Sequence, residues 1–466
     1  MTSARPARAR AATGAAERLS QAIRVRTVSA GDGAAPAEGA FAAFRDLLVA
    51  SYPRAHETLA REVLGDGALL YAWPGAEPGL EPLLLLAHQD VVPVEAGTEA
   101  DWSHPPFAGE VAGGFVWGRG ALDDKAAVVA IFEAIESLVA EGFAPRRTVL
   151  VALGTDEEVG GAGGAAAIAR TLRARGVRLA YALDEGLLVT EGILPGLAAP
   201  VALVGIAEKG MLTLELSVRA AGGHASMPPR RTAAGILALA LARLERRPLP
   251  ARLRGAGRAM LEALAPHLPG PARLALANLW AFEPLVRAAL ERRPETAALL
   301  RTTVAPTLLQ AGVKENVLPA TARAVLNVRV LPGESLAGVR RRIEEVVRDA
   351  RVSLRVLEQG SEPSATSSVR SPGWRHLEGA IRACFPEVVV APSLVLAAAD
   401  SRHFRDLAGD VYHFRPWQLR APDLPRIHGT DERIGVADLD RGVAFFRRLL
   451  REELPAAPPP ASGGAR

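Results

Sequence analysis

The stretch Thr148-Val-Leu-Val-Ala-Leu-Gly-Thr-Asp-Glu-Glu-Val-Gly-Gly161 decides the fold class of this chain. Its first half is a run of β-branched and aliphatic residues, which is typical of a strand buried on both faces of a parallel sheet. Three carboxylates, Asp156, Glu157 and Glu158, follow this run directly. Adjacent carboxylates repel one another unless a cation or another partner compensates their charge. The stretch therefore predicts a buried strand with a cation-binding site at its carboxyl end.

Two further predicted strands end in residues that can bind metals. The leucines of 82–93 lead to His88 and Asp90, which share a face of an extended chain because they are two residues apart. This pair suits a metal ligand and the carboxylate that orients it, although a single such pair also arises by chance. The strand 178–183 leads to Asp184. The carboxyl ends of parallel strands line the ligand crevice of an α/β sheet, so we expect these groups to meet.

Two more candidate ligands lie outside these strands. Asp123 and its neighbour Asp124 precede an amphipathic helix, 126–141, where they either cap the helix or supply a shared carboxylate. His428 lies in a short loop between glycine and charged residues. The candidate metal ligands are therefore two imidazoles and three carboxylates: His88, Asp123, Glu158, Asp184 and His428.

This mixture of ligands suits zinc or manganese better than magnesium, which prefers oxygen ligands alone. If one carboxylate bridges, five ligands hold two ions ~3.5 to 4 Å apart, and a bound water has its pKa lowered towards ~7. A general base must lie beside that water. Glu157 is the predicted base because, on an extended chain, it points away from the ligand Glu158.

The chain is long enough for two domains. Strands and helices alternate in the first part, which predicts an α/β domain with a mostly parallel sheet and helices on both faces. Between residues 210 and 360 the predicted order is β, α, β, β, α, β, with a helical insertion at about 248–303. This order is typical of a ferredoxin-like α+β domain. We therefore predict a catalytic domain in two parts, 1–209 and 361–466, with a smaller domain inserted at 210–360.

Composition excludes several classes of protein. The chain has 466 residues, of which 49% are hydrophobic and 23% charged, and a net charge of +4, as in soluble globular proteins. Its arginines are scattered rather than clustered, so no nucleic-acid partner is expected. The single cysteine, Cys384, cannot form a disulfide within the chain, and no stretch reaches the ~18 apolar residues of a membrane span. We therefore expect a cytoplasmic protein without a membrane partner.

Taken in order, these motifs resemble those of a family of di-zinc amidohydrolases that includes carboxypeptidase S, aminoacylase, acetylornithine deacetylase and succinyl-diaminopimelate desuccinylase. The resemblance covers residues 20 to 450 approximately. It is strongest to carboxypeptidase S and the N-acyl amino acid synthase/hydrolases, through four motifs: Ala87-His-Gln-Asp-Val-Val-Pro93, the loop that ends in Pro105-Pro-Phe107, Gly118-Arg-Gly-Ala-Leu-Asp-Asp-Lys125 and Asp400-Ser-Arg-His403.

The resemblance implies a role for each candidate ligand. His88 and Asp184 would bind one zinc ion, Glu158 and His428 the other, and Asp123 would bridge them, next to a non-proline cis peptide. Asp90 would orient His88. Glu157 would take a proton from water and pass it to the leaving nitrogen.

The resemblance also implies a role for residues of the inserted domain. His224 would polarise the scissile carbonyl from across a dimer interface, so the inserted domain would act as a lid and dimerise the chain. Asn316 and Arg329 would contact the substrate, Arg329 through a carboxylate. Arg402 is a further candidate for substrate binding. Taken singly, His224 also fits an ordinary exposed loop histidine, Arg329 an ion-pair residue on a strand, and Arg402 a solvated arginine.

The predicted function is zinc-dependent hydrolysis of an amide bond to a free amino acid, in an N-acyl amino acid or a dipeptide, by a homodimer. Two zinc ions are the expected cofactors, with manganese or cobalt as possible substitutes. The alternatives are a catalytically silent homologue that binds the same substrate and a narrow deacylase of amino acid biosynthesis. The sequence does not decide between hydrolysis and synthesis.

Overall fold

The computed structural model describes residues 14–29, 38–194, 196–358, 360–452 and 454, which form two compact units. The first unit contains the residues up to Ile206, Ser367–Ala391 and those from Ala399 onward. The second contains Ala207–Thr366 and Pro392–Ala398. The sequence predicts boundaries at 209/210 and 360/361, with all residues after 360 in the catalytic domain. The structure differs at Pro392–Ala398, which belongs to the second unit.

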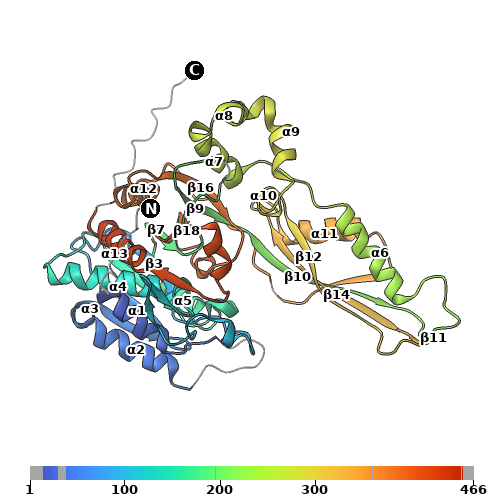
Figure 1. Ribbon diagram of the computed structural model, residues 1–466, viewed down its shortest axis with the longest axis horizontal. Coiled ribbons are helices and arrows are strands. Elements are labelled where there is room, and N and C mark those ends of the chain that lie inside the picture. Colours follow the sequence, from blue (N-terminus) through green and yellow to red (C-terminus); the bar gives the residue numbers. More distant parts are fainter. Residues whose placement is uncertain (1–13, 30–37, 195, 359, 453, 455–466) are drawn as a thin grey trace, which may run out of the picture. The chain divides into compact units, whose positions relative to one another are not determined.

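A ten-stranded sheet organises the first unit (Figure 1). Its order is β1 (Ala60–Leu64), β2 (Ala68–Trp73), β6 (Val149–Gly154), β3 (Leu83–His88), β7 (Tyr181–Asp184), β17 (Val411–His413), β9 (Val201–Glu208), β8 (Val189–Glu191) and β18 (Gln418–Arg420), with β16 (Val389–Val395) paired to β9. The four central strands, β6, β3, β7 and β17, are parallel. Their register places His88 opposite Gly154 and Asp184 opposite His413, so the predicted ligands end neighbouring strands at one edge.

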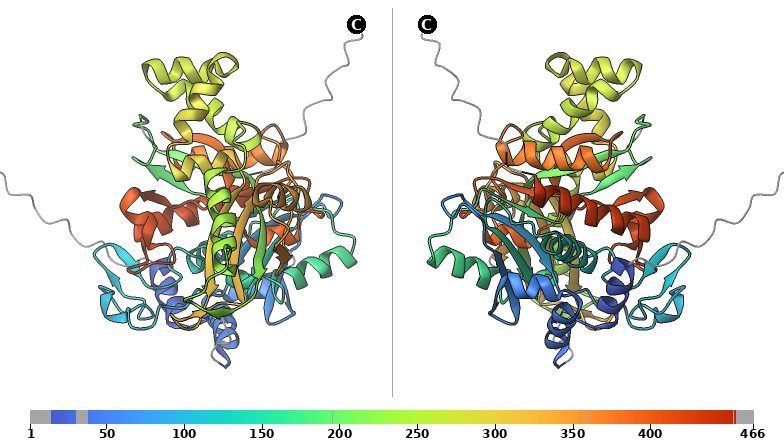
Figure 2. Two further views of the ribbon diagram at one scale, coloured as in Figure 1. Left: turned by 90° about the vertical axis from the view of Figure 1, so that its right-hand side faces the viewer. Right: turned by 90° about the vertical axis from the view of Figure 1, so that its left-hand side faces the viewer.

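The central strands are apolar because helices cover both faces of the sheet. Every residue of β3 and β6 is buried. Alternate residues such as Leu84, Leu86 and Leu150 pack with Ile168 and Leu172 of α5 (Ala165–Ala174). Figures 1 and 2 show the other face covered by a larger group of helices: α1 (Gly14–Arg24), α3 (Pro53–Thr58), α4 (Lys125–Ala140), α12 (Pro372–Cys384) and α13 (Val436–Arg451). The predicted α/β fold with helices on both faces is confirmed.

Shorter elements complete the first unit. The helix α2 (Ala40–Ser51) lies between α1 and α3 in the chain. A small antiparallel sheet joins β4 (Val111–Ala112), β5 (Phe115–Trp117) and β19 (Arg433–Gly435), so the segment after residue 430 pairs with the segment before residue 118. This pairing brings the His428 loop to the Asp123 loop.

The second unit contains an antiparallel sheet in the order β12 (Thr303–Ala311), β14 (Thr321–Val330), β10 (Gly210–Arg219), β15 (Val352–Val356). The inward residues of this sheet form one core with α6 (Ala233–Arg246) and α11 (Leu336–Val347). This is the β, α, β, β, α, β order that the sequence predicted, with ferredoxin-like strand order.

Two further parts of this unit matter for function. Beyond the end of β10, the short strands β11 (Gly223–His224) and β13 (Val317–Leu318) pair with each other. Between α6 and β12 lie four helices: α7 (Gly255–Leu264), α8 (Gly270–Ala277), α9 (Leu279–Leu290) and α10 (Pro294–Leu300). Among the described residues of the chain, no helix combines the length and apolar character needed to cross a membrane.

Candidate active site

Asp123 lies between the two candidate histidines. Its Oδ1 is 2.9 Å from His88 Nε2, and its Oδ2 is 3.0 Å from His428 Nε2. The peptide bond from Asp123 to Asp124 is cis, as the resemblance implied. Although burial opposes ionisation, hydrogen bonds from His428 and His88 lower the pKa of the Asp123 carboxyl. A carboxylate that presents one oxygen to each imidazole has the geometry of a bridging ligand.

A second carboxylate accompanies each histidine. Glu158 Oε1 lies 3.3 Å from His428 Nε2, and Glu185 Oε1 lies 3.4 Å from His88 Nε2. Asp184 was the residue expected beside His88, but its oxygens accept hydrogen bonds from the backbone N–H groups of Ser401 (2.7 Å) and Glu185 (2.8 Å). The structure thus places the Glu185 carboxylate in contact with His88, and the ligand role of Asp184 stays a prediction. The sequence placed both acids at the end of the same strand, and only the turn after the strand distinguishes them.

The residues fit a site for cations. Burial and then repulsion from Glu185 raise the pKa of the Glu157 carboxyl well above its usual range, and burial and then repulsion from Asp123 do the same for Glu185. Glu158 Oε1 is buried against His428 Nε2, and no other described group donates a hydrogen bond to it. Hydrogen bonds that His428 donates to the carboxylates of Asp123 and Glu158 raise the pKa of His428 to about 10. Carboxylates thus crowd this site, and metal ions compensate the negative charge of such ligand sets.

Glu157 is half-buried among these carboxylates, but its backbone differs from the expectation. Glu157–Val159 form a 3₁₀ turn rather than an extended chain. Successive residues of such a turn point about 120° apart. The side chains of Glu157 and Glu158 therefore still point in different directions, because of the 3₁₀ geometry and not because of the alternation of a strand.

Asp90 connects His88 to this turn. Its carboxylate accepts hydrogen bonds from the backbone N–H groups of Glu157 and Glu158, both at 3.2 Å. Asp90 Oδ1 also lies 3.3 Å from His88 Nδ1, and that nitrogen is 3.0 Å from the Asp90 carbonyl oxygen. With Nδ1 held in this way, Nε2 of His88 faces Asp123.

Two buried ion pairs hold the Asp123 segment, and neither was predicted. The Glu432 carboxylate accepts hydrogen bonds from Arg119 Nη1 (2.7 Å) and from the backbone N–H groups of Gly120, Leu122 and Asp123 (3.1, 2.7 and 3.1 Å). Arg119 Nη2 donates to the His428 carbonyl oxygen at 3.0 Å.

On the other side of Asp123, Asp124 accepts two hydrogen bonds from Arg415, at 3.0 and 2.7 Å. The paired residues are about 300 positions apart, and the sequence has no local signal for either pair.

Arg402 and Asp400 lie beside the Glu157 turn. The Nη2 of Arg402 is buried without a hydrogen-bond partner among the described residues and lies near Gly160. Both carboxylate oxygens of Asp400 are also buried without such a partner, against the backbone of Gly154 and Gly161. Arg402 therefore has donor capacity next to the candidate base.

The remaining predicted residues lie in the second unit, at opposite ends of its sheet. His224 is exposed on β11, and the Asn316 carbonyl accepts a hydrogen bond from the N–H of Ala225, so these two residues are neighbours. Arg329 lies on β14 opposite Met211, the second residue of β10, while β11 follows the far end of that strand. Arg329 donates to Asn327 Oδ1 at 3.1 Å.

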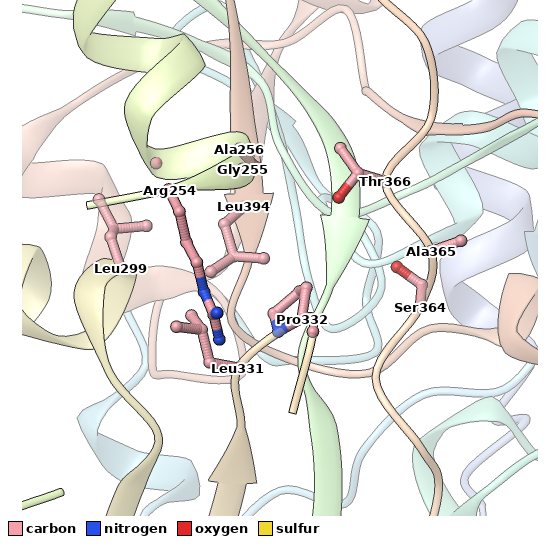
Figure 3. A pocket seen from close by; sticks show the side chains of 12 residues that line it. Arg254, Gly255, Ala256, Leu299, Leu331, Pro332, Ser364, Ala365, Thr366 and Leu394 are labelled. Atoms are coloured by element: carbon pink, nitrogen blue, oxygen red, sulfur yellow. The ribbon is translucent and has the colours of Figure 1, made fainter. Parts of the chain in front are cut away.

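A separate pocket of about 290 Å³ lies wholly within the second unit (Figure 3). Arg254 and the first residues of α7 line it together with Leu299, Leu331 and Leu394. None of the predicted site residues is among its lining residues.

Comparisons with known proteins show which family the chain matches. Residues 84–452 match the model of "Peptidase family M20/M25/M40". The chain is 42% identical over 395 residues to the N-fatty-acyl-amino acid synthase/hydrolase PM20D1.1 of Danio rerio, covering 84% of this chain and 76% of that protein. It is 38% identical over 440 residues to a probable carboxypeptidase S-like 2 protein of Dictyostelium discoideum, covering 94% and 84%.

Among solved structures, the chain is similar to the M20 family metallo-carboxypeptidase Sso-CP2 from Sulfolobus solfataricus. The TM-score is 0.68 at 16% identity, with 94% of this chain and 98% of that chain covered. Human carnosine dipeptidase 1 gives a TM-score of 0.62 at 14% identity, with 94% and 95% covered. At these identities the likeness concerns the fold.

Proposed function

Since the chain belongs to peptidase family M20/M25/M40 and is a metal-dependent hydrolase, we propose that it hydrolyses the amide bond to an amino acid whose carboxylate is free. The observation that carries this proposal is the Asp123 carboxylate, which lies within 3.0 Å of an imidazole nitrogen on each side. Two metal sites that share one carboxylate are typical of co-catalytic centres.

We assign five residues to two zinc ions. His88 and Glu185 would hold one ion, His428 and Glu158 the other, and Asp123 both. Two imidazoles with three carboxylates suit zinc, and manganese or cobalt are possible substitutes. When bound, the ions supply Lewis acidity and lower the pKa of a water in the site.

Glu157 is the proposed general base and acid. It would accept a proton from the attacking water on its carboxylate and donate that proton to the leaving nitrogen. A base for this step needs a pKa near the working pH, and burial among carboxylates raises the pKa of Glu157. Asp90 would act through other groups, because it fixes both the tautomer of His88 and the turn that carries Glu157.

The substrate carboxylate is assigned to Arg329, with Asn316 and His224 at the scissile amide and Arg402 as a further donor. Met211 pairs with Arg329, and Arg219, the last residue of β10, is eight residues beyond Met211, before β11 begins. At ~3.3 Å per residue this is more than ~25 Å, whereas two residues of a substrate span at most ~7 Å.

His224 and Arg329 of one chain therefore cannot contact one dipeptide, which supports a homodimer in which His224 and Asn316 serve the partner's site. The second unit would then be both the lid and the dimerisation domain.

The names of the relatives suggest two substrate classes. The Danio rerio protein is an N-fatty-acyl-amino acid synthase/hydrolase and the Dictyostelium discoideum protein a probable carboxypeptidase. Both classes present an amide followed by a free carboxylate, so both fit the same assignment of residues. We also propose a cytoplasmic location, which the absence of any second cysteine supports.

The test is release of free amino acid from a panel of N-acyl amino acids and dipeptides, with zinc added or chelated. We expect zinc-dependent turnover, a loss of at least ~100-fold for Glu157→Gln with zinc retained, and no loss for the exposed control Glu110→Gln. A loss of less than ~10-fold for Glu157→Gln would contradict the proposed base. Tight substrate binding without turnover, with zinc bound, would indicate the silent binding homologue instead.

A further inference from the structure

The helical hairpin of residues 270–290, formed by α8 and α9, has an apolar face that no described residue covers. On α9 the exposed residues are Trp280, Ala281, Pro284, Leu285, Ala288 and Ala289. These residues form three adjacent pairs that recur every four residues, which places them on a single face of the helix. The opposite face carries the buried Leu279 and Val286, so α9 is apolar on both sides.

The exposure of this face is large. Trp280 is 84% exposed, Leu285 69% and, on α8, Leu274 60%. Single exposed apolar residues are ordinary, but a contiguous apolar face marks a surface that meets another apolar surface. A pocket of about 360 Å³ opens beside Trp280 and is lined also by Leu276 and Leu279. Figure 1 shows the hairpin apart from the sheet of the second unit, so this sheet leaves the face uncovered.

The unpaired charges near this face are mostly positive. Arg273 lies on α8, and Arg292 and Arg293 directly follow α9; all three are exposed. None of the salt bridges between described residues includes any of the three. Three carboxylates of the region pair with arginines: Glu291 with Arg301 at 2.8 Å, Glu262 with Arg258 at 2.8 Å, and Glu283 within 4.0 Å of Arg287. Glu295 on α10 is exposed and is in no salt bridge between described residues. The unpaired charges near the apolar face are therefore three arginines and one glutamate.

We propose that the hairpin docks the enzyme on an anionic lipid surface. A helix that lies in the plane of a bilayer needs one apolar face with tryptophan and leucine, together with basic residues that meet anionic headgroups. A second copy of the chain fits less well, because an antiparallel pair of these hairpins would bring arginines against arginines. The expectation of no membrane partner came from the absence of a long apolar stretch, which excludes a span and not a helix lying on the surface.

The test is co-sedimentation of the full chain with vesicles of phosphatidylcholine alone or mixed equally with phosphatidylglycerol, at low salt. We expect binding to the anionic vesicles. The double variant Trp280→Gln, Leu285→Gln should lower the partition coefficient more than tenfold, because both side chains leave the apolar phase. Replacing Arg273, Arg292 and Arg293 by glutamine should lower it about fivefold per charge and abolish the preference for anionic vesicles.

A matched control is Val63→Gln, at an exposed apolar position on β1, which should bind like the wild type. All the substituted side chains are exposed, so the variants should unfold at the wild-type temperature. Failure of the wild type to sediment with either vesicle would overturn the proposal, as would unchanged binding of the Trp280 and Leu285 variant. If the wild type binds no vesicles and the Trp280 and Leu285 variant has a smaller sedimentation coefficient than the wild type, the apolar face is a subunit contact. This result would also overturn the proposal. None of these outcomes depends on the catalytic proposal.

Discussion

At the scale of single residues, lysine is rare in this chain, and its positions are informative. The sequence has three lysines among 55 basic residues. Lys125 and Lys209 are 0% and 1% exposed. Lys209 Nζ donates to the Arg301 carbonyl oxygen at 2.8 Å, and burial and then repulsion from Arg329 lower its pKa to about 8. A buried ammonium group close to an arginine destabilises the folded chain while it stays charged.

This lowered pKa predicts how stability changes with pH. Between about 8 and the usual lysine value of 10.5, the unfolded chain holds a proton on Lys209 that the folded chain has released. Unfolding then takes up a proton at Lys209, which adds about 1.4 kcal/mol per pH unit to the slope of the unfolding free energy across this window. Lys125, whose pKa burial lowers to about 7, adds a similar slope in the wild type and in Lys209→Met alike. Denaturant unfolding should therefore give a slope that is about 1.4 kcal/mol per pH unit smaller in Lys209→Met than in the wild type.

The exposed Lys314 supplies the control, because Lys314→Met should keep the wild-type slope. Equal slopes for wild type and Lys209→Met would show that Lys209 keeps its proton in the folded chain throughout this window.

Residue identities in the site were largely predictable from the sequence, but not their contacts. His88, Asp123, Glu158 and His428 follow from strand ends and motifs, and the structure brings these four together. Asp184 and Glu185 are adjacent acids, and periodicity does not distinguish them once the strand has ended. The distinction comes from the Ser401 N–H, which binds Asp184 from 217 residues away.

At the scale of elements, the loop that carries Asp123 is held from the C-terminal segment. Glu432 accepts three backbone N–H groups of this loop, and Arg119 links Glu432 to the His428 carbonyl oxygen. One ion pair thus positions two of the proposed metal ligands.

Replacing Glu432 by glutamine should weaken the metal site. The change leaves Arg119 buried without its charge partner and turns an amide group towards backbone donors, which should cost about 3 kcal/mol of unfolding free energy. Zinc affinity, measured by competition with a chelator, should fall at least ~10-fold because the ligands lose their orientation. His104 pairs with Glu110 at an exposed site, so Glu110→Gln is a suitable control. Wild-type zinc affinity in Glu432→Gln would contradict this role.

The elements themselves were predictable because their patterns are local. Apolar runs predicted β3, β6 and β7, and amphipathic spacing predicted α4. The 3₁₀ turn of Glu157–Val159 was missed because it depends on hydrogen bonds from its N–H groups to Asp90, 67 and 68 residues earlier.

At the scale of the whole molecule, the separation of His224 from Arg329 predicts complementation between subunits. Glu157→Gln and His224→Ala should each be inactive alone, since each proposed site takes Glu157 from one chain and His224 from the other. In a mixed dimer one of the two sites has both residues intact. After exchange of equal amounts, about one quarter of wild-type activity should return.

A mixture that stays inactive after verified subunit exchange would rule out sharing of the site. Activity of a monomer in sedimentation experiments would lead to the same conclusion.

The division of the chain into two units could be predicted because the hydrophobic pattern changes near residue 210. The return of Pro392–Ala398 to the second unit could not, because this short segment has the same apolar composition as the strands around it.

The two-metal site is tested most directly by counting zinc atoms per chain after dialysis, in the wild type and in two neighbouring variants. We expect two in the wild type and two in Asp184→Asn, whose amide oxygen can still accept a backbone N–H. Glu185→Gln should retain one, because the site beside His88 loses a ligand. Fewer than two zinc atoms in the wild type, or loss of zinc from Asp184→Asn but not from Glu185→Gln, would contradict the assignment.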